Sequence, residues 1–316
     1  MRLQPANTQW PELNWQDWHA TGDTLHRWMQ VVGKVQLALT PRVNHWWNVA
    51  FHVTARGLTT LPIPYRDGAF EMSFDFIDHA LLIESSTGGR ERIVLQPMSV
   101  AGFYAEVMQG LKRLDIDVHI WTMPCEIADA VRFEDDNAHA SYDAQYAQRF
   151  WRVLLQSHRI FNGFRAQFIG KVSPVHFFWG SFDLAVTRFS GRPAPPHPGV
   201  APNTANWVMR EAYSHEVSSC GFWPGNGGYG RAAFYSYAYP EPSGFAAARL
   251  RTAGAFYDQQ LSEYVLPYDA VRTAADPDRA LMEFLEDTYA AGADAGGWDR
   301  RALERMSGHS ERNASA

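Results

Sequence analysis

The chain has 316 residues, of which 46% are hydrophobic and 20% are charged. This balance is typical of a globular protein and excludes a mainly disordered one. The formal net charge is −6 and no cluster of Lys and Arg occurs, which argues against a nucleic-acid partner because such binding needs a basic surface.

The first half of the sequence predicts a helix, a group of strands and a second helix. Trp15–Val32 has apolar residues at helical spacing, and Gly33-Lys34 suits the end of that helix. In Phe70–Ile77 apolar and polar residues alternate, which is the period of a strand with one buried face. The other expected elements are strands at His45–Ala55, Leu81–Glu84, Arg92–Leu95 and Val118–Trp121, and a helix that begins near Ser99 and ends near Leu114.

The second half repeats this order. A helix over Tyr146–Phe168 is followed by Gly170-Lys171, and an aromatic strand that begins at His176 echoes the one that begins at His45. Further strands are expected at Tyr213–Cys220, Ala232–Tyr239 and Glu263–Leu266, with a glycine-rich turn at Gly225–Gly230 and a last helix at Asp278–Ala290.

The shared order predicts an internal duplication. Because strands occur in runs between helices, the expected fold class is α+β, with two tandem diverged repeats that each hold a mainly antiparallel sheet flanked by helices. The expected boundaries are 1–140 for the first repeat, 141–305 for the second, and 306–316 for a disordered tail.

The two aromatic strands each predict one apolar face and one mixed face. In the first repeat the mixed face carries Trp46 and His52, and in the second it carries Phe177, Trp179 and Asp183. Aligning His45 with His176 places His52 and Asp183 at equivalent positions. A face that is both aromatic and polar suits a pocket between the repeats, and it equally suits a partly exposed sheet.

The stretch from Ala212 to Gly225 is the most unusual in the chain. It holds His215, Glu216 and Trp223, but Ser219 stands where a zinc-peptidase helix would carry its second histidine. In a strand, His215 and Glu216 point to opposite faces, so they are poor ligands for one metal ion. A buried strand that ends in a tight turn is the simpler interpretation.

A proline-rich loop follows the second aromatic strand. Arg188 precedes this loop and His197 lies within it, and the two side chains could hold an anionic ligand. A metal centre built from histidine and glutamate side chains is an alternative, although scattered histidines are more often structural. Its candidate ligands are His176, His197, His215 and Glu216.

Signatures of other classes are missing from the sequence. There is no phosphate-binding loop and no nucleophile elbow, and the glycines at 225–230 are not followed by a helix, as a dinucleotide fingerprint requires. The two cysteines are too few for a disulfide framework. No run of about 18 apolar residues occurs and the first residues lack the pattern of a signal peptide, so we expect a cytoplasmic protein with no membrane partner.

Two long motifs carry a resemblance to a known family. His-Phe-Phe-Trp-Gly-Ser-Phe-Asp-Leu-Ala-Val-Thr-Arg-Phe-Ser-Gly-Arg at 176–192 and Tyr-Ser-His-Glu-Val-Ser-Ser-Cys-Gly-Phe-Trp-Pro-Gly at 213–225 resemble an uncharacterised bacterial family catalogued as a domain of unknown function. The segments 10–18 and 121–124 are similar to it as well, so the likeness covers about residues 10–304. It implies no reaction, cofactor or catalytic residue.

The leading hypothesis is a small-molecule enzyme or ligand-binding protein with its site between the repeats. Hydrolysis or another cofactor-free acid–base reaction is favoured, and the identity of any cofactor is left open. The candidate catalytic residues are Asp183, His215 and Glu216, and the candidate ligand-binding residues are Trp179, Arg188, His197, Trp223 and His52. The alternatives are the metal-dependent enzyme and a non-catalytic module, such as a homodimer, that uses an aromatic sheet face.

Overall fold

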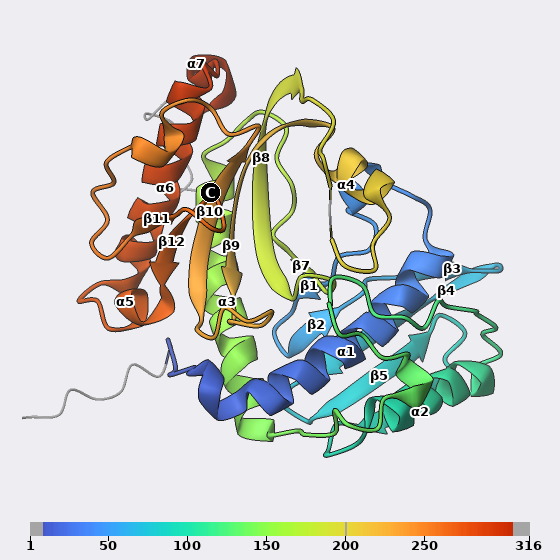
Figure 1. The fold of residues 1–316 in the computed structure, drawn as a ribbon. Helices are drawn as coiled ribbons and strands as arrows, with labels where there is room; N and C mark the ends of the chain where they lie inside the picture. The colour runs from blue at the N-terminus through green and yellow to red at the C-terminus, as the bar shows by residue number, and fades with distance from the viewer. Residues whose placement is uncertain (1–8, 200, 306–316) are drawn as a thin grey trace, which may run out of the picture.

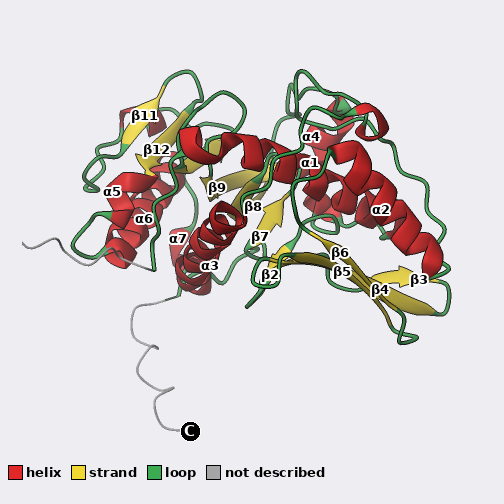
Figure 2. Ribbon diagram, turned by 90° about the horizontal axis from the view of Figure 1, so that it is seen from below, coloured by secondary structure: helices red, strands yellow, loops and turns green. Residues whose placement is uncertain are grey.

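The computed structural model describes residues 9–199 and 201–305, so the expected tail at 306–316 lies outside the described residues. Two antiparallel sheets of six strands each are joined by long helices, which confirms the α+β class and its division into two sheet-containing halves. Figures 1 and 2 show the first sheet with α1 and α2 on one of its faces, and the second sheet beside α3 and α6.

The first half begins with α1 (Trp15–Leu39) and ends with α2 (Val100–Arg113), whose first turn is capped by the Ser99 side chain. Between them a short 3-10 helix, η1 (Asn44–Trp46), precedes six strands. These are β1 (His52–Val53), β2 (Gly57–Thr59), β3 (Ile63–Tyr65), β4 (Gly68–Asp75), β5 (Ala80–Ser85) and β6 (Arg90–Val94). The sheet order is β1-β2-β4-β5-β6, with β3 paired to β4.

The second half has a sheet of order β11-β12-β10-β9-β8-β7. It begins with α3 (Ala144–Ala166), which the Asp143 side chain caps. The strands are β7 (His176–Phe178), β8 (Asp183–Pro193), β9 (His215–Trp223), β10 (Ala233–Tyr239), β11 (Phe256–Asp258) and β12 (Glu263–Pro267). The remaining elements are η2 (Phe133–Asp135), α4 (Asn206–Ala212), η3 (Phe245–Ala247), α5 (Tyr268–Arg272), α6 (Pro277–Ala295) and α7 (Arg300–Leu303).

The alternating pattern of β4 behaves as predicted. Phe70, Met72 and Phe74 are buried, whereas Glu71 and Ser73 keep partial exposure. The buried face of this strand packs beneath α1 and α2, because a strand directs alternate side chains to opposite faces of its sheet. The polar face is left toward solvent.

Helix α1 is the centre of the molecule. Every residue from Leu25 to Gln36 is buried, which is expected only of a helix that is enclosed on all sides. The helix continues through Gly33 to Leu39, so the prediction that it ends at Gly33-Lys34 is wrong. Gly33 has a different role, because a Cβ atom there would lie 2.3 Å from the indole of Trp179.

Replacing Gly33 by alanine is therefore expected to destabilise the protein by about 2 kcal/mol, since displacing a rigid buried ring outweighs the better helix propensity of alanine. Gly110 in α2 is the matched control. Its added Cβ would meet Ile83 at an ordinary 3.4 Å, so Gly110→Ala should be neutral or stabilising. Urea unfolding of both variants measures the difference, and equal effects would contradict the proposed packing role.

The two aromatic segments are not the continuous strands that were predicted. His45 and Trp46 lie in η1 with positive φ values of 56° and 62°, and only His52 and Val53 form a strand there. His176–Phe178 is a strand, but a turn at 179–182 separates it from β8. Val118–Trp121, predicted as a strand, has no regular structure.

The halves meet at their first strands. The backbone N–H of Phe51 donates to the carbonyl of Phe177 over 2.8 Å, and the N–H of Phe177 donates back over 2.7 Å. His45 lies in a 3-10 helix and His176 in a strand, so their alignment, and with it the equivalence of His52 and Asp183, is wrong. A common origin of the two halves stays a prediction.

Candidate functional site

A cavity of about 750 Å³ lies between the two halves. One wall is a face of the second sheet, and the others are α1, η1, the segment 121–126 and α4. Aromatic rings make up much of the lining, from Trp46, Trp47, Trp121, Phe178, Trp179, Phe189, Trp207 and Trp223. These rings thus line a hollow that other segments partly cover and do not form a flat surface, although Trp121 and Trp207 are each about half exposed.

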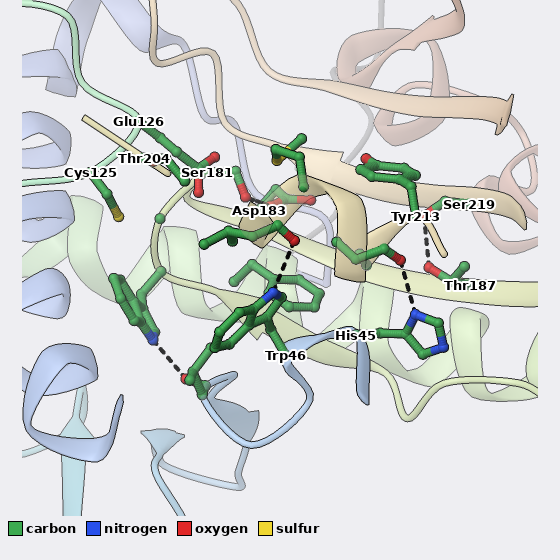
Figure 3. A pocket seen from close by; sticks show the side chains of 18 of the residues that line it. His45, Trp46, Cys125, Glu126, Ser181, Asp183, Thr187, Thr204, Tyr213 and Ser219 are labelled. Carbon is green, nitrogen blue, oxygen red and sulfur yellow. Dashed lines mark hydrogen bonds between the residues drawn. The ribbon is translucent and has the colours of Figure 1, made fainter. Parts of the chain in front are cut away.

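The sheet contributes a polar floor. On β8 the residues that line the cavity are Asp183, Ala185, Thr187 and Phe189, which are alternate positions on one face. Thr187 pairs in register with Ser219 of β9, and their hydroxyl groups are 2.8 Å apart. Figure 3 shows Glu126, Ser181 and Asp183 on one side of the cavity, and His45, Thr187 and Tyr213 on the other.

Asp183 is the most enclosed carboxyl group of this floor, with 7% of its surface exposed. The hydroxyl groups of Ser181 and Tyr235 both donate hydrogen bonds to it. Burial raises the pKa of Asp183, and these hydrogen bonds only partly oppose the shift. No ion pair involves Asp183 among the described residues.

Two further carboxyl groups face the same cavity. Burial raises the pKa of Glu126 to about 7 and that of Glu263 to about 8, and the nearby charge of Asp183 adds to each shift. Many protein atoms lie around the Glu126 carboxyl group, but the residue is exposed to solvent at the wall of the cavity. Neither side chain has a hydrogen-bond or ion-pair partner among the described residues.

Three polar residues of α1 are spaced four apart and therefore share one side of this buried helix. His26 bonds the carbonyl of Gly180 through Nε2 over 2.8 Å, which fixes the turn before Asp183. The Gln30 amide donates to the carbonyl of Cys125 and accepts from its N–H, both over 2.9 Å, which fixes the segment before Glu126. Lys34, the third, lines the cavity.

Helix α4 covers part of the cavity and is attached mainly to η1. The Trp46 indole donates to the carbonyl of Val208 over 3.0 Å, and His45 Nδ1 bonds the carbonyl of Ala212 over 2.9 Å. The Arg42 guanidinium stacks on the rings of Trp46 and Trp207, 4.9 and 4.8 Å from their centroids, and pairs with Glu211. No residue of α4 is fully buried, so few contacts hold this cover in place.

Of the residues selected from the sequence, three line the cavity: Trp179, Asp183 and Trp223. The Trp179 indole donates to the carbonyl of Val49 over 2.6 Å, and Trp223 stacks on Tyr229. His215 does not line the cavity, but its ring centroid lies 5.8 Å from that of His45, which does.

Glu216 and Arg188 point away from the cavity. Glu216 pairs with Arg192 over 2.6 Å and accepts from Ser190, on the opposite face of β9 from Ser219. The Arg188 guanidinium lies 3.5 Å from the centroid of Phe164 and donates to its carbonyl over 2.5 Å, inside the core. The predicted roles as catalytic acid and anion clamp are therefore not supported, since neither side chain reaches the cavity.

His197 and His52 are also outside the cavity lining. His197 stacks on Tyr213, with centroids 4.5 Å apart, and so supports a lining residue from behind. His52 lies beside His176, with centroids 5.9 Å apart, at the junction of the sheets.

A metal centre from His176, His197, His215 and Glu216 does not form, because these side chains lie at separate places. Among residues 9–199 and 201–305, no group of three or more His, Cys, Asp or Glu side chains is arranged to hold a metal ion.

Sequence reasoning did not select Lys34, Glu126, Tyr235, Tyr237 or Glu263, all of which line the cavity. Two signals were present. Tyr235, Tyr237 and Tyr239 alternate along one strand, and His26, Gln30 and Lys34 recur at helical spacing in an otherwise apolar stretch. Glu126 and Glu263 carry no comparable local pattern, because only the folded chain brings them near Asp183.

Comparison with known proteins places the chain in a family. The model of the family of unknown function DUF5996 matches residues 10–305. The chain belongs to the DUF5996 family. No curated protein and no solved structure matches this DUF5996 protein. In the part of the chain that the structure describes, no helix is long and apolar enough to cross a lipid bilayer.

Proposed function

We propose that this DUF5996 protein is a small-molecule enzyme that performs acid–base chemistry in the cavity between its halves. The observation that carries the proposal is the group of three carboxyl side chains, Asp183, Glu126 and Glu263, which face one aromatic-lined cavity without a cationic partner among the described residues. Large apolar pockets with a few convergent polar groups and shifted pKa values are the usual form of an active site.

The carboxyl groups suit proton transfer near neutral pH. A general acid or base works best when its pKa is close to the ambient pH, and burial brings the pKa of Glu126 to about 7. Asp183, held by Tyr235 and Ser181, has a fixed orientation and serves as the base or as the anchor of the substrate. The reaction needs no cofactor in this proposal.

Backbone strain around the cavity supports the same view. His45, Trp46, Glu126 and Asn203 all line the cavity and all have positive φ values, between 49° and 62°. Residues other than glycine adopt this conformation at a cost of order 1–3 kcal/mol each, and four of the ten such residues in the described part of the chain line the cavity. Cys125 and Cys220 are both free thiols, which agrees with a proposed location in the cytoplasm, a reducing compartment.

The test begins with a thermal-shift screen of the purified protein against a library of neutral and charged aromatic metabolites. A ligand at 100 times its Kd should stabilise the protein by about 2.7 kcal/mol. Each hit is then incubated with the protein, and mass spectrometry is used to detect a product.

Asp183→Asn is expected to lower turnover of such a substrate by roughly 10²- to 10⁴-fold, because the amide cannot transfer the proton. Tyr257→Phe is the matched control, since Tyr257 bonds Glu241 and does not line the cavity. Full turnover in Asp183→Asn, or hits whose binding is unaffected by substitutions in the cavity, would contradict the proposal.

A further inference from the structure

Lys34 is a buried amine that faces the cavity. Its side chain lies among the most enclosed charged groups of the chain, with 4% of the residue exposed, yet it lines the cavity. The amine has no hydrogen-bond or ion-pair partner among the described residues. Its one specific contact is with the ring of Trp121, whose centroid is 4.7 Å from Nζ.

Lysine is rare in this sequence, with three lysines against twenty-five arginines. Lys112 is exposed on α2, and Lys171 Nζ bonds His45 Nε2 over 2.6 Å. An arginine at position 34 would supply the same charge and stack at least as well on an aromatic ring, but it could not act as a nucleophile because it does not lose its proton. Lysine at position 34 thus supplies an amine that can lose its proton, which arginine would not.

Burial lowers the pKa of Lys34, since a desolvated ammonium group is disfavoured. The ionisable group that acts on this amine is the Cys125 thiol, whose pKa burial raises to about 12, so this neighbour is neutral and does not stabilise the ammonium form. Each unit by which a lysine pKa falls gives about a tenfold larger fraction of free amine at neutral pH. Desolvation in an apolar pocket is the known way to make a lysine nucleophilic.

We propose that Lys34 forms an imine with the carbonyl carbon of an aldehyde or ketone that is bound in the cavity. This inference rests on the proposed function and specifies the substrate class. The lone pair of Nζ forms the C–N bond, and the carbonyl oxygen takes up a proton to give a carbinolamine. The C–O bond then breaks, and the oxygen leaves as water with the second proton from nitrogen.

Carboxyl groups of the same cavity supply and accept these protons. Glu126 follows Cys125 in the segment that Gln30 fixes, so the same helix holds both this carboxyl group and Lys34. With a pKa of about 7, Glu126 is suited to give a proton to the leaving hydroxyl group and to take one back, with water of the cavity carrying the proton between Glu126 and the nitrogen. The aromatic lining would hold the apolar part of the carbonyl compound.

The experiment is reductive trapping with 2-naphthaldehyde and sodium cyanoborohydride, which reduces an imine to a stable secondary amine. Peptide mapping then measures the labelling rates of Lys34, Lys112 and Lys171 in one sample. We expect Lys34 to react at least about tenfold faster than the exposed Lys112 at pH 7.5. As the pH is raised, the labelling rate of Lys34 should reach its plateau at a lower pH than the rate of Lys112 does. Formaldehyde, which fits any site, provides a second pH profile for each amine.

Two variants and one inert probe separate the possible failures. Lys34→Arg keeps the charge and the contact with Trp121, so it should fold and lose only the label, whereas Lys112→Arg should leave labelling of Lys34 unchanged. Stabilisation by 2-naphthalenemethanol, which cannot form an imine, reports binding in the cavity alone. Labelling of Lys34 no faster than that of Lys112 with both aldehydes overturns the imine. If 2-naphthalenemethanol still binds in that case, the proposed cavity function stands.

Discussion

Glu263→Gln is expected to raise the free energy of unfolding by about 3 kcal/mol at pH 8, the largest gain of any single substitution considered for the cavity. Glu263 is mostly buried, faces Asp183 on β8 and Asp258 on β11, and has no cationic partner among the described residues. Glutamine keeps the shape of the side chain and removes the cost of a buried charge. Chemical denaturation at several pH values measures the gain.

The gain should depend on pH in a defined direction. The folded-state pKa of Glu263, about 8, lies above the ordinary value of 4.5, so the folded protein binds the proton more tightly than the unfolded chain does. Wild-type stability from this group is present below about pH 4.5 and is lost as the pH rises to about 8. The advantage of Glu263→Gln should therefore vanish near pH 4.5. Glu106→Gln, at an exposed position of α2, should show no such trend.

This gain also bears on function, because a group that destabilises the fold but remains in a cavity fits a catalytic role better than a structural one. If Glu263→Gln were destabilising at pH 8, the Glu263 carboxylate of the wild type would have to be stabilised by a partner. The claim that this carboxyl group faces the cavity without a cationic partner would then be wrong. Glu126 borders the cavity more openly, so a smaller gain of the same sign is expected there.

Elements with a strong local pattern could be predicted from the sequence. The alternation in Phe70–Ile77, the helix that begins near Ser99 and the last helix predicted from Asp278 each appear in the structure where local sequence places them. These signals depend on residues close in the chain, and tertiary packing does not override them. The α+β class follows from their order.

The errors have a common physical cause. Gly33 resembles a helix end because glycine favours that position, but here it gives room to the Trp179 ring from the other half. His45–Ala55 has strand-like composition, but Trp46 and His45 instead bond α4 from a left-handed turn. In both cases a contact between segments more than a hundred residues apart decides the local conformation.

The candidate site was predictable only in part for the same reason. Asp183 was found because it shares the mixed face of the predicted aromatic strand with Trp179, which is a local signal. The charged groups that give it chemical interest come from 121–126 and β12, which the sequence does not link to it. Arg188 was selected because it flanks the proline-rich loop, but alternation along β8 directs its side chain to the face opposite Asp183, into the core.

His176→Phe is expected to stabilise the protein most strongly in acid. His176 is buried at the junction of the two sheets, and neither ring nitrogen has a hydrogen-bond partner among the described residues. Burial lowers its pKa to about 3, and the charges of His52 on β1 and Arg165 on α3 add to the shift. Phenylalanine keeps a ring against Phe178 and removes the unsatisfied polar atoms, which should contribute about 1 kcal/mol at pH 7.

The sign of the acid effect follows from proton binding. Above about pH 6.5 neither the folded nor the unfolded chain protonates this histidine, whereas between pH 6.5 and 3 only the unfolded chain does, so stability falls as the pH falls. At pH 5 this single group costs about 2 kcal/mol, which His176→Phe would remove.

The exposed His119 is the control, and His119→Gln should follow the wild-type pH profile. If the free energy of unfolding of His176→Phe fell in acid as steeply as that of the wild type, His176 would have to be protonated in the folded protein at these pH values. Because Phe177, next in the chain, makes the backbone bridge to Phe51, protonation of His176 acts where the two halves join, so acid should loosen the walls of the cavity first.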